Sequence, residues 1–213
     1  MSMDEAEDHR RFAPSTARNR DVIRDVFLAH APTQGRVLEI AGGAGEHAVH
    51  IASDAPNLTW FVGDPDETAR RSIRAWIDHA GLENIRGPHA IDAARDDWGL
   101  DAYAPVDMIV SINMIHIAPF EACEGLVRGA SEHLAHDGKL FLYGPYRRHG
   151  EHTALSNAAF DESLRMRDPR WGIRDLDTEI IPLCAKHGLE LQQVVEMPAN
   201  NFVIIFGKSK KDI

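Results

Sequence analysis

The sequence predicts an α/β protein with a mostly parallel seven-stranded sheet, helices on both faces and a C-terminal antiparallel β-hairpin. Short apolar runs alternate with segments of helical periodicity, which is typical of repeated strand–helix–strand units. A glycine cluster lies between the first apolar run and the helical pattern after it. The last two apolar runs are separated only by residues 197–201, too few for a parallel crossover.

The expected strands are short and apolar, as strands buried in a parallel sheet should be. They are residues 36–40, 58–62, a weaker run that ends near residues 91–92, and residues 108–112, 140–143, 189–196 and 202–206. The last two of these form the hairpin.

Apolar residues at helical spacing predict the helices between these strands. The first helix starts after Pro14, and the helix after the second strand is capped by Asp66 and ends at Gly81. A later helix starts at Pro119 and continues to Gly138. A polar insertion over residues 147–174 is expected to form a lid over the active site. Pro182 should kink or delay the helix that follows.

Composition limits the class of protein. The chain has 213 residues, 44% of them apolar, which suits a single domain (1–213) with residues 1–10 flexible. A net charge of -10 argues against nucleic acid as a partner, because phosphate recognition needs a basic face. No apolar run suits a bilayer span or a signal peptide. We therefore expect a cytoplasmic monomer or homodimer that acts on a small-molecule substrate, with no membrane partner.

The glycine cluster is the strongest local signal of a binding site. Gly43 and Gly45 fall between a strand and a helix, where glycines let the backbone approach a ligand closely. The string G-A-G-E-H-A over residues 43–48 also matches the dinucleotide fingerprint G-x-G-x-x-A. The glycines alone therefore leave two ligands open, a nicotinamide dinucleotide and S-adenosyl-L-methionine.

Three carboxylates follow three successive strands around this loop. Glu39 ends the first strand, where a carboxylate repels a pyrophosphate and attracts a sulfonium or an ammonium group. Asp64 lies about twenty residues beyond the loop, the usual distance of a carboxylate that accepts from ribose hydroxyls. Asp92 would accept from the exocyclic amine of adenine. Because ligands bind at the carboxyl ends of such strands, the set favours S-adenosyl-L-methionine.

The set Glu39, Gly43, Gly45, Asp64 and Asp92 resembles the cofactor site of class I S-adenosylmethionine-dependent methyltransferases, which implies a Rossmann-like sheet. Ala41 departs from that pattern, since it stands where the motif usually has its first glycine. Longer strings resemble the family of methyltransferase-like protein 26, found in bacteria and animals. They are RFAPS (11–15), RNR (18–20), NMIHI (113–117), FLYGPY (141–146), SNAAFD (156–161) and MPANN (197–201). This resemblance implies the fold and the cofactor, and carries over no substrate or catalytic residue.

Further candidates lie after the fourth and fifth strands. His116 and Tyr146 are the candidate catalytic residues, because a histidine near pH 7 can take a proton from a nucleophile. Asn113 is a candidate cofactor ligand. Candidate substrate contacts are Arg147, Asn157 and Trp171 in the insertion. The twelve histidines lack a ligand framework of known spacing, so no metal is expected.

These observations favour a methyltransferase that moves a methyl group from S-adenosyl-L-methionine to a small molecule by in-line displacement. Two alternatives stay open: a nicotinamide-dependent oxidoreductase, and a non-catalytic module that binds the cofactor.

Overall fold

The computed structural model describes residues 8–100 and 102–208. Its main sheet has seven strands in the order β3-β2-β1-β4-β5-β9-β8. The strands are β1 (Gly35–Ile40), β2 (Leu58–Gly63), β3 (Ile85–His89), β4 (Val106–Ile112), β5 (Leu134–Gly144), β8 (Leu189–Met197) and β9 (Asn201–Lys208). The first five pair in parallel, and β9 is antiparallel to both β5 and β8. The predicted Rossmann-like sheet with a terminal hairpin is confirmed.

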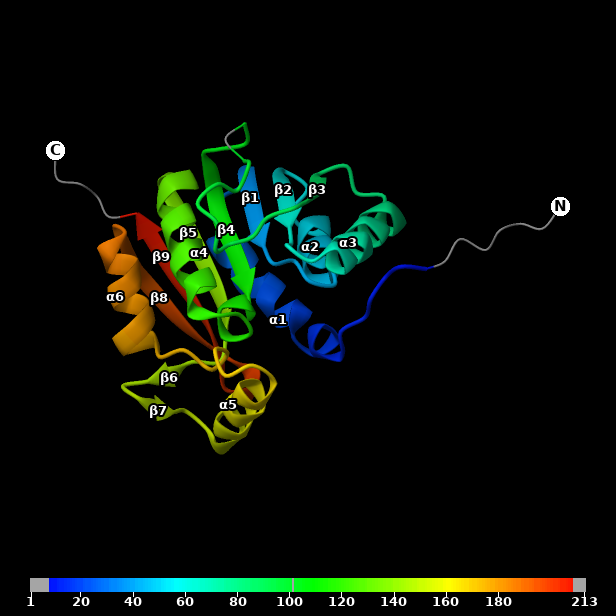
Figure 1. Ribbon diagram of the computed structural model, residues 1–213. Coiled ribbons are helices and arrows are strands. Elements are labelled where there is room, and N and C mark those ends of the chain that lie inside the picture. The colour runs from blue at the N-terminus through cyan, green and yellow to red at the C-terminus, as the bar shows by residue number, and fades with distance from the viewer. Residues whose placement is uncertain (1–7, 101, 209–213) are drawn as a thin grey trace.

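Helices cover both faces of the sheet (Figure 1). On one face, α1 (Pro14–His30), α2 (Glu46–Ser53) and α3 (Glu67–Ala80) pack on a cluster that includes Val37 and Trp60. On the other, α4 (Phe120–His133) and α6 (Ile181–Lys186) pack on a cluster that includes Leu38 and Leu140. Val37 and Leu38 are neighbours in β1, so the alternation of a strand sends them to opposite faces.

The insertion after β5 has structure of its own. It contains a small hairpin of β6 (Arg147–Arg148) and β7 (Glu151–His152), then α5 (Leu155–Arg167). A π-helical turn (Leu176–Ile180) leads into α6, and Pro182 falls in the first turn of that helix. Figure 1 shows the β6–β7 hairpin and α5 together at one end of the molecule, beyond the lower ends of β8 and β9.

Local signals placed most element ends correctly, but three of the expected boundaries are wrong: the end of α4, the end of β3, and the start of β5, which was expected at residue 140 and lies at Leu134. Gly81 takes φ +62° at the end of α3, and Asp66 accepts a hydrogen bond from the Ala69 amide at its start. The helix expected to reach Gly138 ends at His133, because Leu134 already pairs with Val106 in the sheet. Likewise β3 ends at His89, which leaves Asp92 in the loop beyond it.

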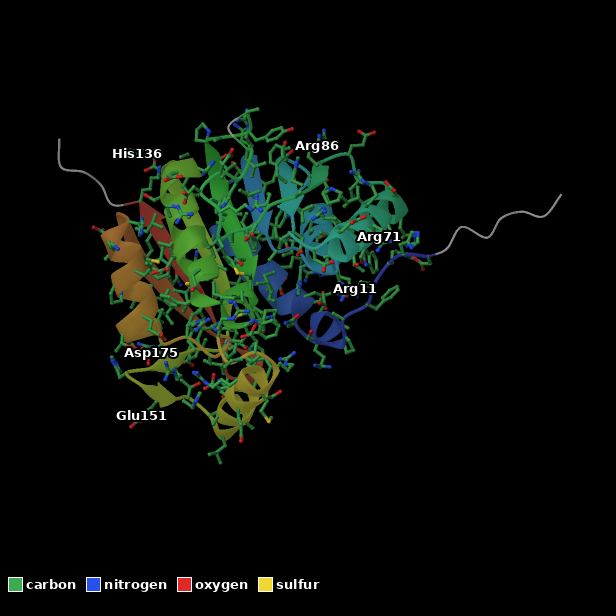
Figure 2. The ribbon with its side chains drawn as sticks, viewed as in Figure 1. Arg11, Arg71, Arg86, His136, Glu151 and Asp175 are labelled. Atoms are coloured by element: carbon green, nitrogen blue, oxygen red, sulfur yellow. The ribbon has the colours of Figure 1, made fainter. Side chains whose placement is uncertain are left out.

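Among the described residues, no helix is long and apolar enough to cross a membrane. Residues 1–7 of the segment expected to be flexible lie outside the described residues. The chain from Arg10 onward packs against α3, and Figure 2 shows Arg11 beside the helix that carries Arg71. There the Arg11 amide donates to the Ser72 hydroxyl over 2.8 Å, and the Trp76 indole donates to the Arg11 carbonyl.

Candidate functional site

The glycine loop between β1 and α2 is held open by its backbone conformation. Gly43 and Gly45 have φ of +58° and +91°, in the left-handed region that favours glycine. A Cβ at Gly45 would lie 2.9 Å from the Cα of Ile73, so α3 leaves no room for a side chain there. Ala41 also has a positive φ, +60°, so the alanine at the expected glycine position is strained. A Cβ at Gly43 would meet no described heavy atom within 4 Å outside its chain neighbours, so a ligand can approach this backbone.

Asp64 joins the glycine loop to the end of β2. Its carboxylate accepts from the Gly43 amide over 3.0 Å and from the Asp66 amide over 2.9 Å. Next to it, the Gly42 amide donates to the Gly63 carbonyl over 3.0 Å. Burial of the side chain raises the pKa of Asp64 above its usual value. Each carboxylate oxygen has one backbone donor, and an ionised carboxylate can accept several hydrogen bonds at once.

Glu39 lies beneath the glycine loop. Its side chain is buried, and its carboxylate accepts from the Trp60 indole over 3.0 Å. A Cβ at Gly42 would lie 3.9 Å from the Glu39 carboxyl carbon, so the acid supports the loop from below. Burial raises the pKa of Glu39 to about 8, and the negative charge of Asp64 adds to the shift.

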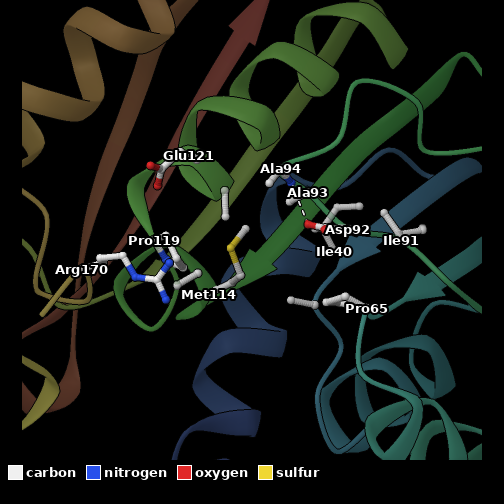
Figure 3. A pocket seen from close by; sticks show the side chains of 13 residues that line it. Ile40, Pro65, Ile91, Asp92, Ala93, Ala94, Met114, Pro119, Glu121 and Arg170 are labelled. Atoms are coloured by element: carbon white, nitrogen blue, oxygen red, sulfur yellow. Dashed lines mark hydrogen bonds between the residues drawn. The ribbon is translucent and has the colours of Figure 1, made fainter. Parts of the chain in front are cut away.

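A cavity of about 400 Å³ opens beside the loop at the carboxyl ends of the strands (Figure 3). Its lining is mostly apolar and includes Ile40, Pro65, Ile91, Ala93, Met114 and Pro119. Asp92 lies on one side, 44% exposed, and accepts from the Ala94 amide over 3.0 Å. Glu121 and Arg170 lie on the opposite side of the view. Apolar walls with a carboxylate such as Asp92 at the edge suit a heteroaromatic ring with an exocyclic amine.

His116 is buried where Arg174 of the insertion packs against the segment after β4, and it lies outside the lining of this cavity. Its exposed fraction is 0%, and its Nδ1 accepts from the Arg174 amide over 3.2 Å. The proton of the neutral ring is therefore on Nε2, which has no hydrogen-bond partner among the described residues. Burial lowers the pKa of His116 to about 3, and the Arg174 charge adds to the shift. The ring fills the space above Gly144, where a Cβ would lie 2.5 Å from Nε2.

Tyr146 and Asn113 border the same histidine. The Tyr146 ring meets His116 edge to face, with centroids 4.9 Å apart, and its buried hydroxyl has no partner among the described residues. Burial raises the pKa of Tyr146 well above its usual range. Asn113 takes φ +63° after β4, and its amide donates to the Tyr143 carbonyl. The structure thus brings Asn113, His116 and Tyr146 together at the ends of β4 and β5.

The three insertion residues expected to contact substrate do not converge. Arg147 pairs with Glu179 over 3.2 Å and donates to the Ile173 carbonyl. Asn157 is buried and donates to the Asn200 carbonyl over 3.0 Å, which joins α5 to the β8–β9 turn. Trp171 is partly buried under the Arg167 guanidinium, which lies 5.5 Å from its ring. Of the insertion, Arg170 is the residue that lines the cavity.

Arg174 is a buried residue of this region that the sequence analysis missed. It is 8% exposed and donates to the carbonyls of Ile115 and Ala118 over 2.8 Å each. It therefore ties the insertion to the segment after β4 that carries His116. An arginine directly after the apolar pair Gly172–Ile173 is the signal for it in the sequence.

Within residues 8–100 and 102–208, no group of three or more His, Cys, Asp or Glu side chains is arranged to hold a metal. Cys123 and Cys184 are buried free thiols, and burial raises the pKa of Cys123 to about 12.

The chain belongs to the family described as Protein of unknown function (DUF938), whose model matches residues 10–208. It is similar to ribosomal RNA small subunit methyltransferase C of Enterobacter sp. (strain 638), with 28% identity over 122 residues. That match covers 56% of this chain and 33% of the relative. The chain spans about a third of the length of the curated relatives it matches.

Solved methyltransferase structures share the fold. An O-methyltransferase family 2 protein from Planctomyces limnophilus, in complex with apigenin, superposes with a TM-score of 0.73 at 19% identity, over 91% of this chain and 60% of that one. The calicheamicin-biosynthesis methyltransferase CalO1, in an S-adenosylhomocysteine-bound form, superposes with a TM-score of 0.72 at 18% identity, over 92% of this chain and 54% of that one. This chain therefore has the fold of class I S-adenosylmethionine-dependent methyltransferases.

Proposed function

We propose that this protein transfers a methyl group from S-adenosyl-L-methionine to a small-molecule acceptor. The observation that carries the proposal is that the glycine loop, Asp64 and Asp92 lie at the carboxyl ends of neighbouring strands, beside a cavity that Ala41, Pro65 and Asp92 help to line. Ligands of open parallel sheets bind at this edge. The methyltransferase fold and the curated methyltransferase relatives support the same reaction class.

The residues present fit this cofactor. The open backbone at Gly43 leaves room for the ligand, Asp64 would accept from the ribose hydroxyls, and Asp92 would accept from the adenine amine. The apolar cavity walls would hold the adenine ring. Glu39, beneath the loop, would act on the amino-acid end through the loop backbone, and Asn113 would border that end from β4. When bound, the cofactor supplies an electrophilic methyl group on a sulfonium.

The protein's part in such a displacement is to align the acceptor and exclude water. His116 is fully buried and lies outside the cavity lining, so we propose that it positions the segment after β4 and does not take a proton from the acceptor. Its Nδ1 lone pair already accepts from the Arg174 amide, and its lowered pKa makes it a weak base. Tyr146 would hold that ring in place. Arg147, Asn157 and Trp171 would fix the lid that shapes the acceptor side of the site.

A small molecule is favoured over RNA as the acceptor. The net charge is -10, and Arg147 and Arg148, the basic pair next to the lid, are neutralised by Glu179 and Asp177. An RNA-methylating enzyme would need free cations along a groove. A nicotinamide-dependent oxidoreductase is less well supported, because the curated relatives and solved structures similar to this chain are methyltransferases. The further proposals are kinship with methyltransferase-like protein 26, a cytoplasmic location and a monomer or homodimer.

The direct test is isothermal titration calorimetry with S-adenosylhomocysteine, with NADH as the competing ligand. We expect micromolar or tighter binding of S-adenosylhomocysteine and none of NADH. Absence of S-adenosylhomocysteine binding up to millimolar ligand would refute the proposal. A screen of phenols, carboxylates, thiols and amines for cofactor turnover then separates the enzyme from a non-catalytic binding module, which would bind tightly and turn over none of them.

A further inference from the structure

Arg20 occupies a core-facing position of α1 that an apolar residue would normally fill. The buried residues of this helix are Thr16, Ile23 and Phe27. Arg20 lies four residues after Thr16 and three before Ile23, so helical spacing places it on the same stripe. Its side chain is partly buried, and Ile23 and Phe27 on that stripe pack directly on the sheet.

The guanidinium of Arg20 has no partner within the described part of the chain. Its Nε is fully buried and makes no hydrogen bond. No described carboxylate forms an ion pair with it, whereas Arg24, one turn on, pairs with Asp21, Asp25 and Asp54. Burying a charged donor without an acceptor is costly, so an unpaired guanidinium on a core-facing stripe points to a missing anion.

The neighbours of Arg20 place it beside the glycine loop. Its charge acts on His47, which is in the first turn of α2, two residues after Gly45. The side-chain oxygen of the adjacent Asn19 accepts from His47 Nε2 over 3.0 Å, and its side-chain nitrogen donates to the Tyr143 hydroxyl at the end of β5. Arg20 therefore lies in the turn of α1 that faces the start of α2, next to Asn19, which contacts the end of β5.

The proposed cofactor position leads to this point. The adenine pocket lies beside Asp92 and the ribose acceptor is Asp64, whose carboxylate bonds the Gly43 amide. A cofactor laid over these two residues has to continue across the glycine loop. Helix α1 meets α2 on one face of the sheet, whereas Ile91 and Ala93, which flank Asp92, pack on the other face. The α-carboxylate at that end is an anion of the right chemistry for a guanidinium, which binds carboxylates through two parallel hydrogen bonds.

We propose that Arg20 binds the α-carboxylate of the amino-acid end of S-adenosyl-L-methionine. The assignment rests on the proposed function, and it adds a cofactor-binding residue outside the glycine loop and the three strand-end acids. Arg20 would also select the intact cofactor over adenosine-type ligands that lack the amino acid.

The test compares two ligands on two variants. Arg20→Met removes the charge and keeps an apolar stem, and Arg18→Met is the matched control, since Arg18 is exposed on the same helix. Calorimetry is run with S-adenosylhomocysteine and with 5′-methylthioadenosine, which lacks the carboxylate. We expect Arg20→Met to bind S-adenosylhomocysteine at least about tenfold more weakly, because charge-assisted hydrogen bonds are lost. The affinity of Arg20→Met for 5′-methylthioadenosine should stay within about twofold of the wild-type value. Arg18→Met should stay within about twofold of the wild type for both ligands.

The melting temperature of the free variants adds an independent readout. Because Arg20 is unpaired, Arg20→Met should melt at the same temperature as the wild type or higher, whereas a packing role would lower it. Unchanged binding of S-adenosylhomocysteine by Arg20→Met would overturn the assignment and leave a substrate carboxylate as the alternative source of the anion. Equal weakening for both ligands would also overturn it, as a sign of structural damage. Wild-type protein that binds neither ligand would refute the proposed function itself.

Discussion

Replacing Asp64 with asparagine separates the two roles that we assign to this side chain. The carboxylate holds the glycine loop to β2 through the Gly43 and Asp66 amides, and we propose that it also accepts from the ribose hydroxyls. Because the same carboxylate serves both roles, its replacement should change both the stability of the protein and its affinity for the cofactor.

The structure sets the size of each effect. Asparagine keeps one acceptor oxygen and turns an NH₂ group toward the other backbone amide, so one hydrogen bond to a charged group is lost. Such a bond contributes about 2 kcal/mol to stability. The neutral asparagine offsets part of this loss, because it removes a charge whose burial is unfavourable, as the raised pKa of Asp64 shows. At about 2–4 °C per kcal/mol for a chain of this size, the melting temperature should fall by roughly 4–8 °C. Loss of the charged acceptor for ribose should weaken S-adenosylhomocysteine about 10- to 100-fold.

Asp66→Ala is the matched control, because Asp66 caps α3 through the Ala69 amide and has no place in the proposed site. It should lower stability by about 1 kcal/mol with affinity retained. The assay pairs melting curves with calorimetry on both variants. The ligand arm uses 5′-methylthioadenosine and its 2′-deoxy form, between which the wild type should discriminate and Asp64→Asn should not. Equal discrimination by both proteins would refute the ribose role of Asp64.

Three further predictions follow from backbone and burial. Ala41→Gly should raise the melting temperature by about 2 °C, because relief of about 1–2 kcal/mol of left-handed backbone strain exceeds the cost of the added entropy of glycine in the unfolded chain. Gly43→Ala should lower the melting temperature, because it puts a side chain on a residue with positive φ. Melting curves in which both variants shift in the same direction would contradict this reasoning. Glu39 has a pKa of about 8 in the folded protein against 4.5 in the unfolded chain. Its contribution to the free energy of unfolding is therefore complete below pH 4.5 and is lost as the pH rises through 8. Glu39→Gln should therefore become more stable relative to the wild type as the pH rises from about 5 to about 9, as measured by denaturant titration. A difference in the free energy of unfolding that does not change with pH would count against a buried neutral acid. His116 has a pKa of about 3 in the folded protein against 6.5 in the unfolded chain. Its contribution to the free energy of unfolding is therefore present above pH 6.5 and is lost as the pH falls toward 3. His116→Gln should be less acid-sensitive than the wild type, which denaturant titrations at pH 4 and pH 7 would check.

Local chemistry explains which parts of the fold the sequence predicts. Gly81 and Asp66 end and begin α3 through interactions within one turn, so their roles can be inferred from neighbouring residues alone. Leu134 continues a helical pattern, but pairing with Val106 in the sheet decides its conformation, and no local pattern records that pairing. The positive φ of Ala41 is likewise imposed by the loop between two fixed elements.

The sequence predicts the positions of candidate site residues that lie at strand ends. It does not predict which of them are buried or already paired. Asp64 and Gly43 meet because adjacent parallel strands end at one edge, a consequence of topology. The neutralisation of Arg147 by Glu179 joins residues 32 positions apart, and the burial of His116 depends on the insertion packing against the segment after β4. Such long-range partners decide whether a charged or titratable side chain is available, and spacing in the sequence does not specify them.

The most direct test of the central claim is a crystal structure of the protein with S-adenosylhomocysteine. We predict adenine in the apolar cavity with its amine at Asp92, both ribose hydroxyls on the Asp64 carboxylate, and the amino-acid end across the glycine loop at Gly43. Ligand bound elsewhere, or bound at this edge with its ribose away from Asp64, would contradict it.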